Sequence, residues 1–86
     1  MEKQTTPENR IALIGIIVED VGKTEQIQTI LHTYSDYIIG RMGIPYRDRH
    51  LNIISVVVDA PNNIISTISG KLGMLDGVSS KTLYQK

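Results

Sequence analysis

The chain has 86 residues, of which 41% are hydrophobic, enough for one packed core and one domain. Nine Lys and Arg residues balance nine Asp and Glu residues, so no overall charge attracts nucleic acid or an anionic membrane. Because the chain has no cysteine, disulfides, thiolate metal sites and thiol nucleophiles are excluded.

The first nine residues, Met1–Asn9, contain no apolar side chain after the initiator methionine. We predict that they form a disordered tail and that residues 10–86 form a single domain. The sequence shows neither a signal peptide nor an apolar run long enough to cross a membrane. We therefore expect a cytoplasmic protein.

The segment Arg10–Glu19 is the most hydrophobic part of the chain. Apolar side chains occupy both faces of a strand drawn through Ile11–Val18, which is typical of a central strand. A polar loop follows, and residues Thr24–Ser35 then carry apolar side chains at helical spacing. We predict a helix here, with Thr24 as its N-cap.

A hairpin comes next. Its first strand, Ile38–Pro45, contains two glycines and a proline, which favour bulges or bends and a place at the edge of a sheet. The connection Tyr46–His50 is charged. The second strand, Leu51–Val58, is rich in β-branched residues with two usable apolar faces, and it predicts a second central strand.

The last third of the chain predicts a helix and a strand. Asp59–Asn62 is typical of a helix start, because a short acceptor side chain precedes a proline suited to the first turn. An apolar stripe then continues until Gly73, where we expect the helix to end. Val78–Tyr84 is short and polar, which favours the other edge of the sheet.

These elements follow the order β-α-β-β-α-β. That order predicts an α+β fold, the ferredoxin-like two-layer sandwich, with a four-stranded sheet of antiparallel type in the order 4132. Right-handed crossovers lead us to expect the two apolar strands side by side and parallel in the middle of the sheet.

Two helices cover only one face of such a sheet. About six aliphatic side chains on the other face, at roughly 60 Å² each, would be worth on the order of 9 kcal/mol if buried. We therefore predict a homo-oligomer, a dimer or a tetramer, and the alternative is a partner protein that covers the same face.

The chemistry known for this fold is largely excluded. An iron–sulfur site needs cysteines, and an RNA-recognition surface needs aromatic residues where the central strands here are aliphatic. No acid, base and nucleophile form a catalytic set, so we expect no enzyme and no cofactor. Two histidines, His32 and His50, are weak evidence for a metal site in a chain without cysteine, and we expect no bound metal.

Several residues could hold an anion. Forked guanidinium groups suit a carboxylate or phosphate, and the candidate cations are Arg41, Arg47, Arg49, Lys71 and, beside them, His50. Asn62 lies where the exposed amides of the second helix could meet the same anion. The alternatives are a solvated hairpin with a charged edge strand, and a capping role for Asn62.

Four stretches of the sequence resemble a known family: RIALIGIIVED, YIIGRMGIPYR, ISVVVDAPNNIIS and GKLGMLDGVSSKTLY. Over Arg10–Tyr84 the chain is similar to the iron-only hydrogenase system regulators. The resemblance implies an ACT-like fold, similar to the C-terminal, ligand-sensing domain of nickel-responsive repressors, and oligomers built through the sheet. In ACT-type sensors the loop that corresponds to Asp20 and Gly22 contributes to ligand binding between subunits.

The nickel-responsive relatives bind metal with histidines and a cysteine, and because this chain has no cysteine, nickel sensing does not carry over. Their DNA-binding domain has no counterpart here, so we expect no direct DNA binding. We predict a non-catalytic regulator of transcription that senses a small ligand between subunits. The alternatives are an assembly factor for hydrogenase maturation that binds no ligand, and an enzyme assembled across the interface from arginine and aspartate of two chains.

Overall fold

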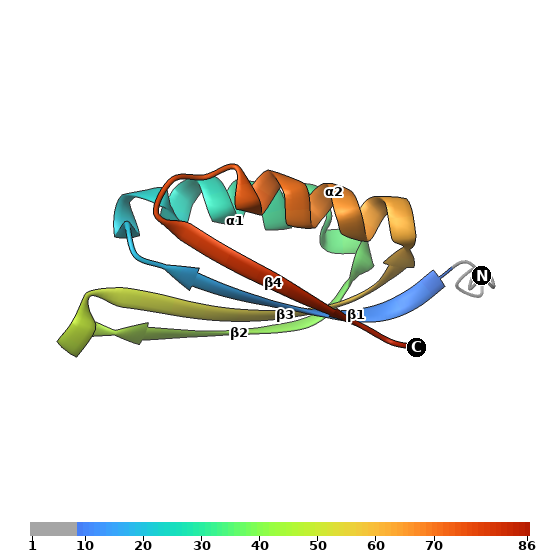
Figure 1. Ribbon diagram of the computed structural model, residues 1–86, viewed down its shortest axis with the longest axis horizontal. Helices are drawn as coiled ribbons and strands as arrows, with labels where there is room; N and C mark the ends of the chain where they lie inside the picture. Colours follow the sequence, from blue (N-terminus) through green and yellow to red (C-terminus); the bar gives the residue numbers. More distant parts are fainter. Residues whose placement is uncertain (1–8) are drawn as a thin grey trace.

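The computed structural model describes residues 9–86 and has two layers, a twisted four-stranded sheet and a pair of helices on one of its faces (Figure 1). The β-α-β-β-α-β order is confirmed. The elements are β1 Asn9–Val18, α1 Thr24–Thr33, β2 Ile38–Tyr46, β3 Leu51–Pro61, α2 Asn62–Gly73 and β4 Val78–Tyr84. The predicted tail lies outside the described residues except for Asn9, which begins β1.

The strand order β2-β3-β1-β4 is the predicted order 4132 read from its other end. β1 and β3 are adjacent in the centre, as predicted, but they run antiparallel, so the expectation of parallel central strands is wrong. Each helical crossover joins parallel strands that are not neighbours, β1 with β2 and β3 with β4. The β2–β3 hairpin reverses the chain, and β3 therefore runs against β1.

The core lies between the sheet and the helices. Side chains alternate in and out along the central strands, so every second residue of β1 and β3 is buried under the helices. The fully buried set is Ala12, Ile14, Ile16, Val18, Ile27, Leu31, Ile54, Val56, Val58, Ala60, Ile65, Ile68 and Leu72. Within residues 9–86 this core contains no polar side chain.

The ends of α1 differ from the predictions because short 3-10 turns flank the helix. The turn Val21–Lys23 leads directly into α1, and no side chain caps its first residues. Thr24 is therefore not an N-cap, and its hydroxyl instead accepts a hydrogen bond from the Asn52 side chain at 3.1 Å. A second turn, Ser35–Tyr37, makes the helix end at Thr33 rather than at Ser35.

The strand β3 is longer than predicted. Asp59 and Ala60 pair with Ile11 and Arg10 of β1, so the strand runs to Pro61 and the helix begins only at Asn62. Pairing with a central strand outweighs the local helix-start signal at these residues. The predicted end of α2 at Gly73 and both ends of β4 are confirmed.

The two edges behave as the composition suggests. Between Ile38 and Gly40 the register of β2 against β3 shifts, which is a bulge at the first of the two glycines. The β2–β3 hairpin also extends past the helix layer, at the left of Figure 1, and almost every residue of β2 is exposed.

Neither helix of the described residues is long and apolar enough to cross a membrane.

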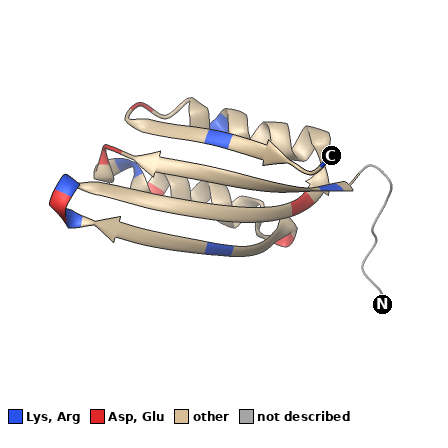
Figure 2. Ribbon diagram, turned by 60° about the horizontal axis from the view of Figure 1, so that its bottom comes forward, with Lys and Arg blue, Asp and Glu red and all other residues tan. Residues whose placement is uncertain are grey.

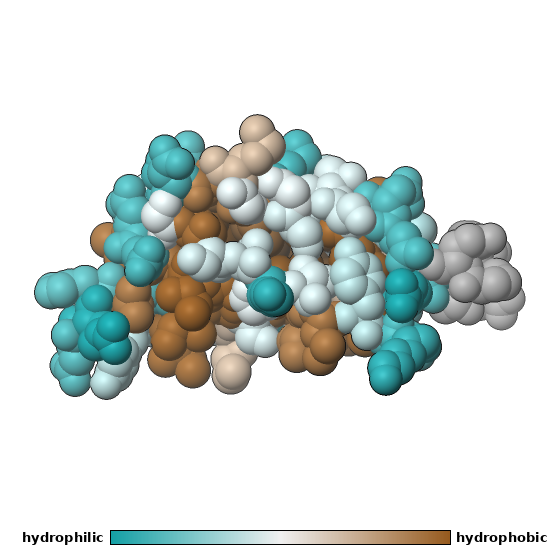
Figure 3. All heavy atoms as spheres, viewed as in Figure 1, coloured by the Kyte–Doolittle hydropathy of each residue, from teal (hydrophilic) through white to brown (hydrophobic). Residues whose placement is uncertain are grey.

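We call the surface of the sheet opposite the helices the outer face. Strand register places eight large apolar side chains on it, namely Ile11, Leu13, Ile17, Met42, Ile44, Tyr46, Ile53 and Leu83. Figure 2 shows that few residues along the strands are charged, and in Figure 3 hydrophobic side chains reach the lower edge of the molecule, beneath the strands. The prediction that the two central strands are apolar on both faces is confirmed.

Candidate functional site

The tip of the β2–β3 hairpin forms one side of a cleft. Arg47–Arg49 make a 3-10 turn, and His50 follows in the left-handed region with φ 55°, the only non-glycine residue of the described chain with positive φ. The 3-10 turn before α1 faces the hairpin and completes the cleft, which has a volume of about 450 Å³. It is lined by Val21, Pro45, Tyr46, Arg47, His50, Leu51 and Asn52.

Asp20 and Gly22 lie beside this cleft, in the loop that the resemblance singled out. The Asp20 carboxylate accepts a hydrogen bond from the Gly22 amide at 3.0 Å and so caps the turn. The Asp20 amide donates to the Gly77 carbonyl at 3.2 Å. Gly77 has φ 76°, and a Cβ there would lie 2.7 Å from Asp20 Cβ. The loop is thus held in one shape, and only a glycine fits beneath it.

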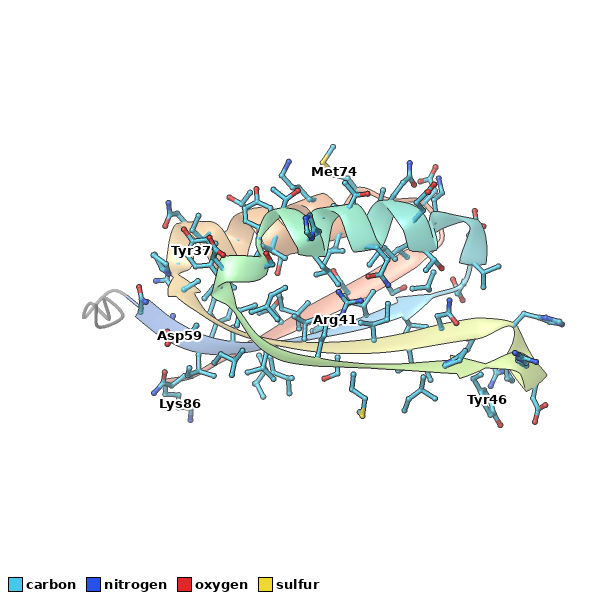
Figure 4. The ribbon with its side chains drawn as sticks, turned by 180° about the vertical axis from the view of Figure 1, so that it is seen from behind. Tyr37, Arg41, Tyr46, Asp59, Met74 and Lys86 are labelled. Carbon is cyan, nitrogen blue, oxygen red and sulfur yellow. The ribbon has the colours of Figure 1, made fainter. Side chains whose placement is uncertain are left out.

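Arg41 lies well away from the hairpin tip. It is in the middle of β2, on the side of the helices, and donates a hydrogen bond to the Gln28 side chain of α1 (Figure 4). Among the predicted anion-binding cations, only Arg47 and His50 line the same cleft, while Arg49 lies in the same turn without lining it. The guanidinium of Arg41 is therefore separate from the other two arginines.

Asn62 lies at the opposite end of the sheet. Its side-chain oxygen accepts a hydrogen bond from Arg10 at 3.3 Å. Arg10 also donates to the Gln85 carbonyl and stacks over the Tyr84 ring at 5.1 Å. Sequence reasoning overlooked this arginine as a partner of Asn62. Arg10 is the second residue of β1 and pairs with Ala60, two residues before Asn62.

Metal binding finds no support in the described part of the chain. Within residues 9–86, no three His, Asp or Glu side chains gather into a group that could hold an ion. The anion constellation expected from the sequence is distributed over four places: the hairpin tip, the middle of β2, the start of α2 and the last turn of α2, which carries Lys71.

The outer face is an apolar surface that the helices of a single chain leave uncovered. Its eight large apolar side chains are between 38% and 69% exposed. Together they leave on the order of 600 Å² of apolar surface in solvent, more than most monomeric proteins show in one patch. A typical protein interface buries about 800 Å² per partner, so the face is of a size suited to association.

Comparison with known proteins adds to this geometry. A family model described as "TM1266-like: Iron-only hydrogenase system regulator, putative" matches residues 10–82. The chain belongs to this family. A solved structure of the uncharacterized protein TM1266 from Thermotoga maritima is similar to this TM1266-like chain, with 39% identity and a TM-score of 0.88, and the match covers 92% of this chain and 100% of that one.

Two less similar solved structures share the fold of this chain, and the likeness extends to the fold only. The C-terminal domain of the MgtC protein from Mycobacterium tuberculosis matches with a TM-score of 0.64 at 11% identity, over 95% of this chain and 94% of that one. A formyltetrahydrofolate deformylase from Pseudomonas putida KT2440 matches with 0.61 at 11% identity, over 85% of this chain and 28% of its own. A search among curated proteins found no match to this TM1266-like chain.

Proposed function

We propose that this chain is a non-catalytic regulator of an iron-only hydrogenase system and that it works as a homo-oligomer, joined through the outer face, with a small ligand held between subunits. The family description supports the regulatory role. The apolar outer face supports the proposed association and the ligand site between subunits, because it is large, continuous over all four strands and uncovered in a single chain.

The energetics favour covering this face. About 600 Å² of apolar surface removed from water stabilises an assembly by on the order of 15 kcal/mol per subunit. Association costs about 4–15 kcal/mol in lost freedom of motion, so burial of the face offsets that cost. An exposed patch of this kind on a free monomer would promote aggregation instead.

The distribution of charge favours a second copy of the chain as the partner. Among the paired strand residues that the structure describes, the outer face carries one cation, Lys81 beside Gly15, and one anion, Asp59 beside Ile11. The two lie four residues apart along β1 and have opposite sign. Two copies related by a two-fold axis can therefore place the Lys81 of each copy near the Asp59 of the other.

A complementation experiment in the source organism tests the role. We expect deletion of the gene to change the level of iron-only hydrogenase activity, and the unmodified gene to restore it. Ile53→Lys, on the outer face, should fail to restore it, whereas Met74→Lys, on the exposed end of the helix layer, should succeed. Unchanged hydrogenase activity in the deletion strain, or full rescue by Ile53→Lys, would contradict the proposal.

A further inference from the structure

The two charged groups of the outer face lie on opposite sides of β1. Lys81 of β4 is the cross-strand neighbour of Gly15, and Asp59 of β3 is the neighbour of Ile11. In Figure 2 a positive stretch of β4 and a negative stretch of β3 lie on either side of β1. Four residue steps along β1 and two strand spacings separate the two groups, a distance of about 16 Å. They are too far apart to pair within one chain, and neither makes an ion pair or a side-chain hydrogen bond with another residue of the described chain.

Leu13 lies midway between these two groups. It is two residues from Gly15 and two residues from Ile11, on the strand that runs between β3 and β4. Its cross-strand neighbours are Val57 of β3 and Leu83 of β4, so this row of the outer face is apolar. The side chain of Leu13 is 40% exposed in the single chain and is available to contact a second one.

We propose that the two-fold axis of the homo-oligomer passes through the position of Leu13, so that Leu13 of each copy packs on Leu13 of the other. A two-fold axis between two facing sheets lies in the plane of contact. Pairing Lys81 of one copy with Asp59 of the other places the axis midway between these groups, at Leu13. Both charge pairs then form at once, one on each side of the leucines. This inference rests on the proposed function, since it locates the axis within the outer-face association.

The arrangement also accounts for a hollow of about 420 Å³ over Gly15. Gly15 does not have positive φ, and a Cβ built on it would meet nothing closer than the Lys81 carbonyl oxygen at 4.0 Å, so the fold of a single chain does not require glycine here. With the axis at Leu13, the strands of the two copies cross at about 70°, near the orthogonal class of sheet packing, and Val57 of the second copy comes over Gly15. Glycine inside a strand often marks such a close approach of another chain.

Mixing variants of opposite charge tests the position of the axis, because only a residue on the axis meets its own copy. Leu13→Lys and Leu13→Glu should each raise the Kd of association at least about 1000-fold, since each brings two like charges into the apolar interface. An equimolar mixture should recover at least about tenfold of this loss, because the lysine of one chain meets the glutamate of the other.

Ile17→Lys and Ile17→Glu are the matched control pair. Position 17 lies on the same strand and the same face, but about 11 Å from the proposed axis, so its two copies are about 20 Å apart. Mixing these two variants should recover less than about threefold. Sedimentation velocity measures association in each sample, and native mass spectrometry identifies the mixed dimers.

Reversal of the charge pair is the second test. Asp59→Lys and Lys81→Glu should each weaken association about tenfold, and a chain with both substitutions should associate like the unmodified chain. Circular dichroism checks that every variant is folded. If the Leu13 variants do not fold, the chain with both reversals gives the deciding result.

The outcomes separate this inference from the proposed function. An oligomer whose Leu13 mixture recovers nothing, whose Ile17 mixture recovers as much, or whose double reversal fails to restore association overturns the inference and leaves the proposed function standing. A folded Leu13→Lys protein with unchanged association would show that the outer face is not the interface, which overturns both proposals. A monomeric unmodified chain also overturns both.

Discussion

Ile17→Lys is expected to convert the oligomer into a folded monomer. Ile17 lies near the centre of the outer face and is 45% exposed in the single chain, so a lysine there can extend into water without disturbing the core. In a two-fold assembly the substitution introduces two like charges into one apolar interface. Burying an unpaired charge costs several kcal/mol, and we expect the Kd of association to rise by at least about 1000-fold.

Met74→Lys is the matched control for that substitution. Met74 is 83% exposed, more than any other large apolar residue described, but it lies at the end of α2 on the far side of the helix layer (Figure 4). We expect it to leave the oligomer intact. Light scattering coupled to size-exclusion chromatography gives the mass of each variant, and circular dichroism checks the fold. An Ile17→Lys protein of unchanged mass would show that the outer face is not the interface.

Ile16→Ala and Ile17→Ala should have different effects, although they remove the same atoms from adjacent residues. Ile16 is buried under the helices, and its truncation leaves a cavity in the core. We expect a loss of about 2–5 kcal/mol in the free energy of unfolding. Ile17 points to the outer face, so truncation should cost the monomer less than about 1 kcal/mol and act mainly on association.

Urea unfolding measures the first effect most cleanly in a background that carries Ile53→Lys, because unfolding is then not coupled to dissociation. In the unmodified background, Ile17→Ala should instead weaken association by about tenfold or more. Equal losses of monomer stability for the two variants would contradict the assignment of the two sides of β1.

Much of the fold follows from the apolar pattern. Strands β1 and β3 are apolar on both faces and lie in the centre, while the polar or glycine-containing strands lie at the edges, as predicted. The direction of β3 relative to β1 was predicted wrongly, because the crossover rule was applied to strands that the hairpin separates. Helix ends were predicted less well, since pairing with β1 and the 3-10 turns beside α1 compete with local capping signals.

The candidate site was harder to predict than the fold. The hairpin arginines were placed correctly in a charged turn, but which of them share a surface depends on strand register and on the reach of the hairpin beyond the helices. The side chain of Arg41 lies on the helix side of β2. It therefore donates a hydrogen bond to Gln28 of α1 and does not join Arg47 at the hairpin tip. The hollow over Gly15 depends on cross-strand neighbours in β3 and β4, and a single strand read alone does not reveal it.

Sedimentation velocity of the unmodified protein, without added ligand and over a range of micromolar concentrations, tests the central claim most directly. We expect one species with the mass of a dimer or a tetramer that persists at the lowest concentration, because the outer face buries enough apolar surface to hold subunits together. A single soluble species with the mass of one chain at every concentration would contradict the account, and the outer face would then have to be covered by a different protein.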